Sequence, residues 1–171
     1  MKTTLWDIAL RRLGTVVALV SILGTTQGCV VGVAEEDADT DAILGEAVQP
    51  IYWNGHDYLF FLASATWQQA RTNCIANGYY LVSINSSSEE TWLQNQETQR
   101  GGGYWWIGYS DIGYEGTWIW EDQSNSVYKN WYVGEPNNSG DEDCAMDNLP
   151  GGKWNDANCG DAFKFICERN Y

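Results

Sequence analysis

The chain has 171 residues, of which ten are Trp and ten are Tyr, and its formal net charge at pH 7 is -14. This length suits one domain with a tail, and aromatic side chains in this number can build the core of a small domain. The acidic charge argues against a nucleic-acid partner and against docking on an anionic lipid surface.

Residues 1–28 predict a signal peptide that is not part of the fold. Lys2, Arg11 and Arg12 supply positive charge, and the apolar stretch 13–24 that follows is too short to span a bilayer as a mature helix. The segment ends before Cys29, and in this it resembles a bacterial lipoprotein signal, in which a small residue precedes a lipid-modified Cys. We therefore expect an exported protein that is anchored by lipid at the cell surface or outer membrane. Ordinary cleavage nearby, which gives a secreted protein, is the alternative.

Residues 29–49 predict a solvated acidic linker, because they carry too few apolar side chains to fold alone. The folded domain is then 50–171. The chain has five cysteines, so a lipid on Cys29 leaves an even number in an oxidising compartment. Those four cysteines permit three disulfide connectivities. They are Cys74, Cys144, Cys159 and Cys167.

The first part of the domain predicts strands and a helix. Residues 51–62 are rich in aromatic and β-branched side chains around a turn at Asn54-Gly55, which predicts one or two strands. Residues 66–76 predict a helix that ends at Asn77-Gly78, and residues 79–84 predict a strand. The expected apolar face of the helix consists of Trp67, Ala70, Cys74 and Ile75.

The rest of the domain predicts a second helix and several strands. Ser86 to Ser88 cap the helix, Glu89 and Glu90 lie in its first turn, where the helix dipole favours acids, and Trp92 and Leu93 supply its apolar contacts. A glycine run breaks the chain before the strands, and one long irregular region follows, of a kind that is usually functional. This order predicts an α+β fold. The glycine run is 101–103, the strands are 104–109, 117–120 and 162–167, and the irregular region is 121–152.

Acidic and amide side chains are concentrated in residues 135–143 and again in Trp154-Asn155-Asp156. Their oxygen atoms are hard donors that suit Ca²⁺, and no second His or thiolate pair favours zinc or copper. Cys144 and Cys159 flank the cluster. A solvated loop has a similar composition, so the acidic run alone leaves both interpretations open.

Taken together, the motifs of residues 50–171 resemble the C-type lectin-like domain. Each motif alone is weak, but their order and spacing are specific, and one departure is Tyr109 in place of Leu. The resemblance implies a C-type lectin-like fold with two helices flanking small antiparallel sheets and a long calcium-binding loop. The motifs are Thr66-Trp67-Gln68-Gln69-Ala70-Arg71 before Cys74, Tyr80-Leu81-Val82-Ser83-Ile84, Glu89-Glu90, Trp106-Ile107-Gly108-Tyr109, Asn130-Trp131, Glu135-Pro136-Asn137, Glu142-Asp143-Cys144, Trp154-Asn155-Asp156 and Cys159.

The same resemblance implies the disulfide pairs Cys74–Cys167 and Cys144–Cys159. Chain-entropy arguments give these bonds roughly 4 to 5 and about 3 kcal/mol of stabilisation, respectively. It also implies that Pro136 follows a cis peptide bond, which costs little only before proline.

Two Ca²⁺ sites are implied by the matching positions. Members that bind sugar share some ligands between metal and sugar, because carboxylates accept hydrogen bonds from hydroxyl groups and amides donate to them. A solvated turn is the alternative interpretation of Asp111 and Glu115. The implied primary calcium ligands are Glu135, Asn137, Glu142, Asn155 and Asp156. All of these except Asp156 are also expected to contact sugar. The implied auxiliary ligands are Asp111, Glu115, Asn138 and Asp143, and Glu142 is shared between the two sites.

We expect a Ca²⁺-dependent module that binds glycans and has no catalytic residues. The Glu-Pro-Asn triplet at 135–137 resembles the mannose-type version, which implies sugars with vicinal equatorial hydroxyls: mannose, glucose, N-acetylglucosamine or fucose. A protein-binding or adhesion domain on the same fold is the alternative, because fold alone does not decide function. A hydrolase is disfavoured because His56 is the only histidine, it is expected on a strand surface, and no motif places it beside a nucleophile.

The first prediction concerns the expected lipid anchor at Cys29. We expect the wild-type protein to partition into the detergent phase, and a Cys29→Ala variant not to mature normally, because the variant lacks the thiol that carries the lipid. Phase partition and N-terminal sequencing of the mature chain measure this. A wild-type protein that is wholly soluble and is cleaved away from Cys29 would contradict it.

Overall fold

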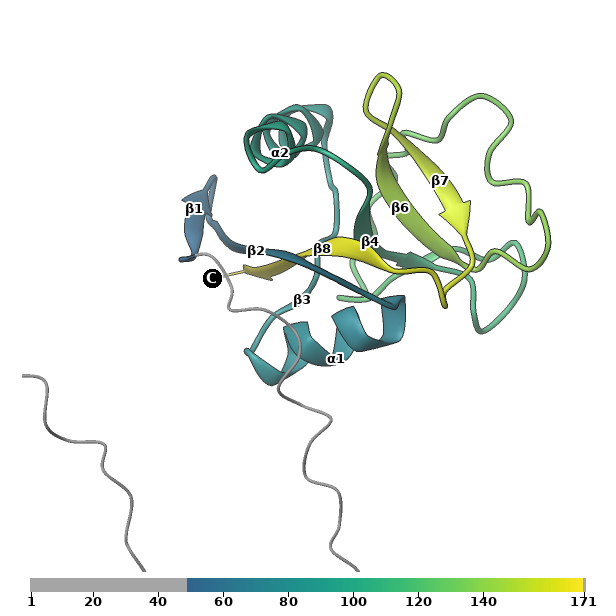
Figure 1. Cartoon of the computed structure of the whole chain (residues 1–171), viewed down its shortest axis with the longest axis horizontal. Coiled ribbons are helices and arrows are strands. Elements are labelled where there is room, and N and C mark those ends of the chain that lie inside the picture. The colour runs from purple at the N-terminus through teal and green to yellow at the C-terminus, as the bar shows by residue number, and fades with distance from the viewer. Residues whose placement is uncertain (1–48, 171) are drawn as a thin grey trace, which may run out of the picture. The chain divides into compact units, whose positions relative to one another are not determined.

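The computed structural model describes residues 49–170 (Figure 1). The predicted signal peptide, Cys29 and all but the last residue of the predicted linker lie outside the described residues. No helix within 49–170 is long and apolar enough to cross a membrane.

The strands form one sheet in the order β1-β2-β8-β4-β6-β7, with β3 paired to β8 and β5 paired to β4. All pairs are antiparallel except β4 with β8, where Trp105 lies opposite Lys164 and Trp106 opposite Phe165. This parallel pair joins the ladders that the sequence predicts as separate small antiparallel sheets. The strands are β1 (Ile51–Trp53), β2 (His56–Ala65), β3 (Tyr80–Leu81), β4 (Trp105–Ser110), β5 (Ile119–Trp120), β6 (Cys144–Leu149), β7 (Lys153–Ala157) and β8 (Phe163–Asn170).

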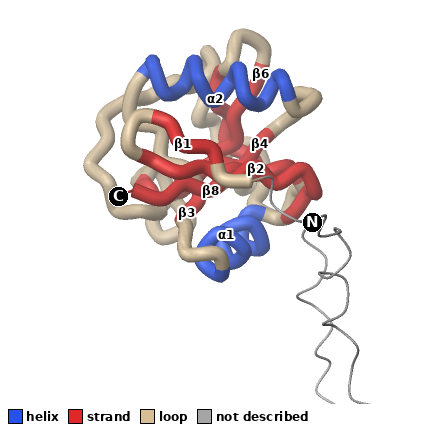
Figure 2. The backbone as a smooth tube through the Cα atoms, turned by 90° about the vertical axis from the view of Figure 1, so that its left-hand side faces the viewer, coloured by secondary structure: helices blue, strands red, loops and turns tan. Residues whose placement is uncertain are grey.

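Two helices lie on opposite sides of the strands, α1 (Trp67–Ala76) and α2 (Ser87–Gln99), as Figure 2 shows. The Thr66 side chain accepts a hydrogen bond from the Gln69 backbone, and the Gln69 side chain accepts one from the Thr66 backbone, which together form a capping box. The Ser86 side chain caps α2 in the predicted place. Both helices and the α+β class are thus confirmed.

Cysteines and aromatic rings hold the core together. The structure contains the disulfides Cys74–Cys167 and Cys144–Cys159, with Cα separations of 5.4 and 5.2 Å, so the implied pairing is confirmed. Trp106 and Trp120 are buried in the core, and Trp118 is partly buried against it.

Three details of the predicted elements are wrong. Ile75 is 45% exposed and does not belong to the buried face of α1. Of the strand predicted at 79–84, only Tyr80 and Leu81 form β3. The Val82 amide still donates to Ile166 of β8, but the Val82 carbonyl accepts from Gly108 of β4. A Cβ at Gly108 would lie 2.5 Å from the Leu81 carbonyl oxygen, so this crossing requires glycine. Finally, the region 121–152 is not wholly irregular, since it contains β6.

Buried carboxyl groups lie between α2 and β6. Glu90 and Glu97 of α2 and Asp147 of β6 are at most 3% exposed, although Glu90 was expected only to complement the helix dipole. Burial raises the pKa of Glu90 to about 9 and of Glu97 to about 8, with a further contribution from the neighbouring acids. The pKa of Asp147 is raised to about 7, again chiefly by burial. These groups therefore favour their protonated forms in the folded domain.

The second prediction concerns these buried acids. The folded state keeps a proton on Glu97 that the unfolded chain releases above about pH 4.5, so in calcium-free buffer the free energy of unfolding should fall between about pH 4.5 and 8. Each such group contributes up to about 1.4 kcal/mol per pH unit. Glu97→Gln should flatten the dependence, measured by urea denaturation at several pH values.

The exposed Asp161 provides the matched control, because Asp161→Asn also removes one carboxylate. A dependence in Glu97→Gln as steep as in the wild type would contradict the assignment of the proton to this carboxyl group.

Candidate functional site

The long loop between β5 and β6 carries the triplet predicted to bind calcium (Figure 1). The peptide bond between Glu135 and Pro136 is cis, as the resemblance implied. Gly134 precedes it at a φ of 102°, which lies in the region that favours glycine, and the Glu135 amide donates to Tyr132 at 3.1 Å. This local geometry places Glu135 and Asn137 on either side of the proline.

Asp156 connects this loop to the sheet. It lies on β7 with no exposed surface, and its Oδ2 accepts hydrogen bonds from the backbone amides of Asn137 at 2.8 Å and Asn138 at 2.7 Å. Its Oδ1 is buried and has no partner among the described residues. A buried carboxylate oxygen without a donor is costly, and a metal ion would satisfy it.

The other predicted primary ligands are positioned around Asp156. The Asn137 amide donates to Glu135 Oε2, and the Glu142 carboxylate accepts from the Ser139 backbone at 3.0 Å. Asn155 precedes Asp156 on β7, and its side-chain amide donates to the Asp156 carbonyl. The structure thus joins Glu135 to Asn137 directly and Asn137 to Asp156 through the backbone.

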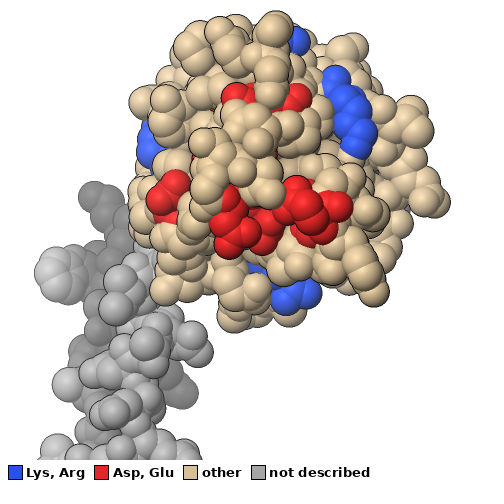
Figure 3. Space-filling view, turned by 90° about the vertical axis from the view of Figure 1, so that its right-hand side faces the viewer, with Lys and Arg blue, Asp and Glu red and all other residues tan. Residues whose placement is uncertain are grey.

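Desolvation and charge repulsion both raise the pKa values of the acids here. The pKa of Glu135 is raised, first by desolvation and then by Asp156 and Glu142. The pKa of Glu142 is raised by desolvation, with Asp156 and Asp161 adding to the effect. Figure 3 shows Asp and Glu gathered near the middle of this face, with Lys and Arg at its margins. A cation would relieve the repulsion.

The predicted auxiliary ligands lie beside this group. Asp111 is 2% exposed, its Oδ2 accepts from the Gly116 amide at 2.7 Å, and its Oδ1 is buried without a partner in the described part of the chain. The Asp111 amide donates to the Asp143 carbonyl at 3.1 Å. Desolvation raises the pKa of Asp111, and Asp143 and Asp156 raise it further. Glu115 is exposed, and its pKa is raised by desolvation and next by Asp111.

Asn138 contacts both predicted sites. Its backbone amide donates to Asp156, and its side-chain oxygen accepts from the Glu142 amide at 2.8 Å. The loop therefore holds the primary and auxiliary ligand sets against one another.

These residues fit Ca²⁺. No three His, Cys, Asp or Glu side chains of residues 49–170 converge closely enough to enclose a metal by themselves. The predicted set also contains amide oxygens, and Ca²⁺ accepts six to eight oxygen ligands in flexible geometry. The unpartnered oxygens of Asp156 and Asp111 would each gain a partner.

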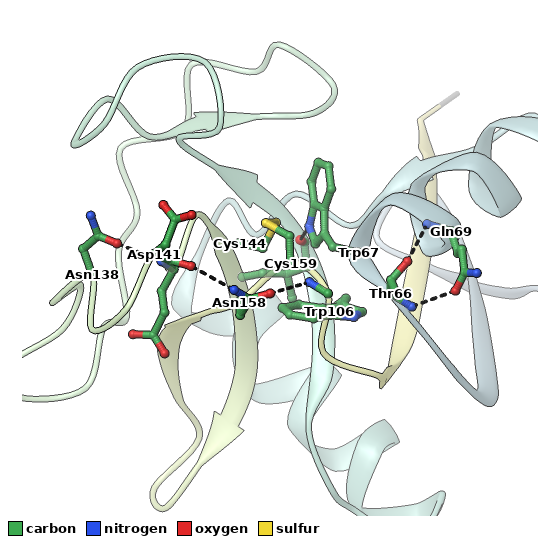
Figure 4. The surroundings of a disulfide bond; sticks show 12 residues. Thr66, Trp67, Gln69, Trp106, Asn138, Asp141, Cys144, Asn158 and Cys159 are labelled. Atoms are coloured by element: carbon green, nitrogen blue, oxygen red, sulfur yellow. Dashed lines mark hydrogen bonds between the residues drawn. A yellow bond between two sulfur atoms is a disulfide. The ribbon is translucent and has the colours of Figure 1, made fainter.

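The second disulfide fixes the end of the loop (Figure 4). Cys144 begins β6, Cys159 follows β7, and the Cys159 carbonyl accepts from the Trp67 amide of α1 at 3.0 Å. Asn158 donates through its side chain to the Asp141 carbonyl at 3.2 Å, which ties the acidic segment to the disulfide. Asn158 was not predicted as part of the site, because no motif in the sequence marks it.

His56 lies on β2, away from the acidic loop. Its Nδ1 contacts the Glu168 carboxylate on β8, and its side chain is 27% exposed. The prediction of a strand position is confirmed, although the ring is more enclosed than expected.

Comparisons with known proteins agree with this architecture. Residues 63–169 match the family model described as the lectin C-type domain. C-type lectin domain family 4 member M of Symphalangus syndactylus is 40% identical over 121 residues, which cover 69% of this chain and 28% of that protein. The chain thus spans less than a third of that relative's length.

Two solved structures share the fold. The cow C-type carbohydrate-recognition domain of CD23, solved in the presence of a GlcNAc2Man3 oligosaccharide, is 36% identical with a TM-score of 0.66, covering 75% of this chain and 98% of that one. Herring type II antifreeze protein is 28% identical with a TM-score of 0.67, covering 71% of this chain and 96% of that one.

The third prediction concerns calcium and stability. A ligand that binds only the folded state raises the free energy of unfolding by about 2.7 kcal/mol at a hundred times its Kd. We expect the melting temperature of the wild type to rise with Ca²⁺ and fall with EGTA, and the rise to be much smaller in Asp156→Asn. Differential scanning calorimetry with and without Ca²⁺ measures both.

The control is Asp161→Asn, which removes the same charge near Glu142 but no predicted ligand. It should keep the wild-type response. Melting curves of the wild type that are identical in Ca²⁺ and EGTA would eliminate the metal site.

Proposed function

This chain belongs to the C-type lectin domain family, and we propose that it is a Ca²⁺-dependent carbohydrate-binding module. The observation that carries the proposal is the pair Glu135 and Asn137 on either side of a cis proline, held by Asp156, whose second oxygen has no partner among the described residues. Export and a lipid anchor at Cys29 belong to the same proposal, with glycans as the partner.

The side chains would act as follows. The Glu135 and Glu142 carboxylates accept hydrogen bonds from sugar hydroxyls, and the amides of Asn137 and Asn155 donate to them. Ca²⁺, when bound, would accept two vicinal hydroxyls in its coordination shell. The hydrogen bonds that Asp156 accepts from the Asn137 and Asn138 amides keep this arrangement fixed before a sugar arrives. Less conformational freedom is then lost on binding.

We propose that the module has no catalytic activity. The paired carboxylates of a glycosidase must include one that is protonated and donates to the leaving group. Carboxylates that bind Ca²⁺ stay ionised and cannot do this. His56 contacts Glu168 and not a Ser, Thr or Cys nucleophile.

A protein-binding or adhesion domain is the second candidate. The observation that favours it is that a herring antifreeze protein shares the fold, so the fold is not restricted to carbohydrate-recognition domains. In that case Ca²⁺ would only order the loop. Loss of binding to every glycan, together with retained calcium-dependent stability, would favour this candidate.

The sugar class follows from the triplet Glu135-Pro136-Asn137. The acid and the amide define which side of the calcium accepts hydrogen bonds and which side donates them. Two equatorial neighbouring hydroxyls, as in mannose, glucose or N-acetylglucosamine, or the comparable pair in fucose, suit this order, and the axial 4-hydroxyl of galactose does not. We propose affinity in the millimolar range for one such sugar, about 4 kcal/mol.

The fourth prediction tests both calcium dependence and sugar class. On a glycan array the wild type should bind mannose-type sugars in Ca²⁺ and lose them in EGTA. The double variant Glu135→Gln with Asn137→Asp should shift preference toward galactose, because it exchanges the accepting and donating sides.

The control exchanges one carboxylate and one amide elsewhere, Asp161→Asn with Asn95→Asp, both on exposed residues. It should keep the wild-type preference. A wild-type domain that prefers galactose in saturating Ca²⁺ would overturn the sugar assignment, and retention unaffected by EGTA would overturn the calcium dependence.

A further inference from the structure

A groove of about 390 Å³ lies beside the aromatic core of the long loop, and none of the predicted calcium ligands lines it. Its size falls within the range of about 300 to 1,000 Å³ that small-molecule sites occupy. Its walls include Tyr109, Trp118, Trp120, Ser124 and Lys129.

Aromatic rings form one wall of this groove. The rings of Tyr109 and Trp120 are stacked with centroids 4.3 Å apart, and the Trp118 ring lies 5.4 Å from Tyr109. Trp118 is only partly buried, so part of its ring remains accessible. Tyr109 occupies the position at which the resembling motif has Leu, so this wall is more aromatic here than the motif requires. Tyr109 and Trp120 are at most 2% exposed, so Trp118 offers the ring on which the apolar face of a ring-shaped ligand can pack.

The side chain of Lys129 brings a positive charge to the same groove. Lys129 is an exposed residue, but its ammonium lies 4.1 Å from the centroid of the Tyr109 ring, and desolvation lowers its pKa. Within residues 49–170 its ammonium forms no ion pair, whereas Arg71 and Arg169 both pair with carboxylates. The groove therefore presents a positive charge that contacts an aromatic ring but pairs with no carboxylate of residues 49–170.

We propose that this groove binds a sugar unit that carries a carboxylate, such as a hexuronic acid. The sugar ring packs on Trp118, and its carboxylate faces Lys129. This inference rests on the proposed carbohydrate-binding function and adds a second subsite to it. The Tyr109 ring connects the two, because it packs on Trp154, at 6.1 Å between centroids, directly before Asn155.

The net charge of -14 opposes an acidic ligand at long range. At physiological salt that field decays over about 8 Å, so recognition depends on the local ammonium and not on the sum of charges. Selectivity for the acid should therefore disappear when this one charge is removed.

The test is a titration followed by tryptophan fluorescence, in Ca²⁺ at physiological salt. The probes are a glucuronic acid trisaccharide, the neutral glucose trisaccharide of the same linkage, and a glutamate tripeptide. We expect the acidic sugar to bind the wild type at least tenfold more tightly than the other two. Lys129→Gln should remove this preference, and Trp118→Leu should weaken binding of both sugars.

Lys153→Gln is the matched control, because it removes the same charge from a residue outside the groove lining, and it should keep the preference. Mannose binding measured on every variant checks the fold. Equal binding of the neutral sugar or the peptide to the wild type would overturn the proposal. Mannose binding without any binding of the acidic sugar would overturn this inference alone, whereas loss of both would overturn the proposed function as well.

Discussion

The carboxylate of Asp156 is the contact on which the candidate site depends. It is buried on β7, and its Oδ2 accepts the amides of Asn137 and Asn138. These two hydrogen bonds hold a loop that has no strand of its own between β5 and β6. They use only one oxygen, and the other is buried without a partner in residues 49–170. The same residue therefore fixes the loop and provides a position for a cation.

The neighbouring Trp154 anchors β7 in turn. Its ring is fully buried, packs on Trp120 and Trp131, and donates through Nε1 to Glu90 of α2 at 2.9 Å. A parallel bridge pairs Trp131 with Trp154, and the Tyr132 amide donates to the Trp154 carbonyl at 2.8 Å. The loop thus lies against β7, and β7 in turn contacts α2 through Trp154 and Glu90.

Much of the fold was predictable because it depends on local signals. Capping by Thr66 and Ser86 and the turn at Asn54-Gly55 are local properties, and the motif resemblance supplied the disulfides and the cis proline. The failures concern long-range contacts. No periodicity shows that Glu97 is buried against a strand fifty residues away, or that the Val82 carbonyl accepts a hydrogen bond from Gly108. For the site, the sequence named the residues, but only the structure shows that Asp156 and Asp111 each keep one unpartnered oxygen.

Two groups of acids in this domain respond to pH in opposite ways. Glu90, Glu97 and Asp147 are buried and prefer to hold protons, so raising the pH destabilises the fold through them. The acids around Asp156 must lose protons to bind a cation, so raising the pH favours the metal. Trp154 lies between the two groups, because its indole donates to Glu90 and its chain continues into Asn155. If the proposed site binds calcium, the metal would supply stability in the pH range where the buried acids lose it.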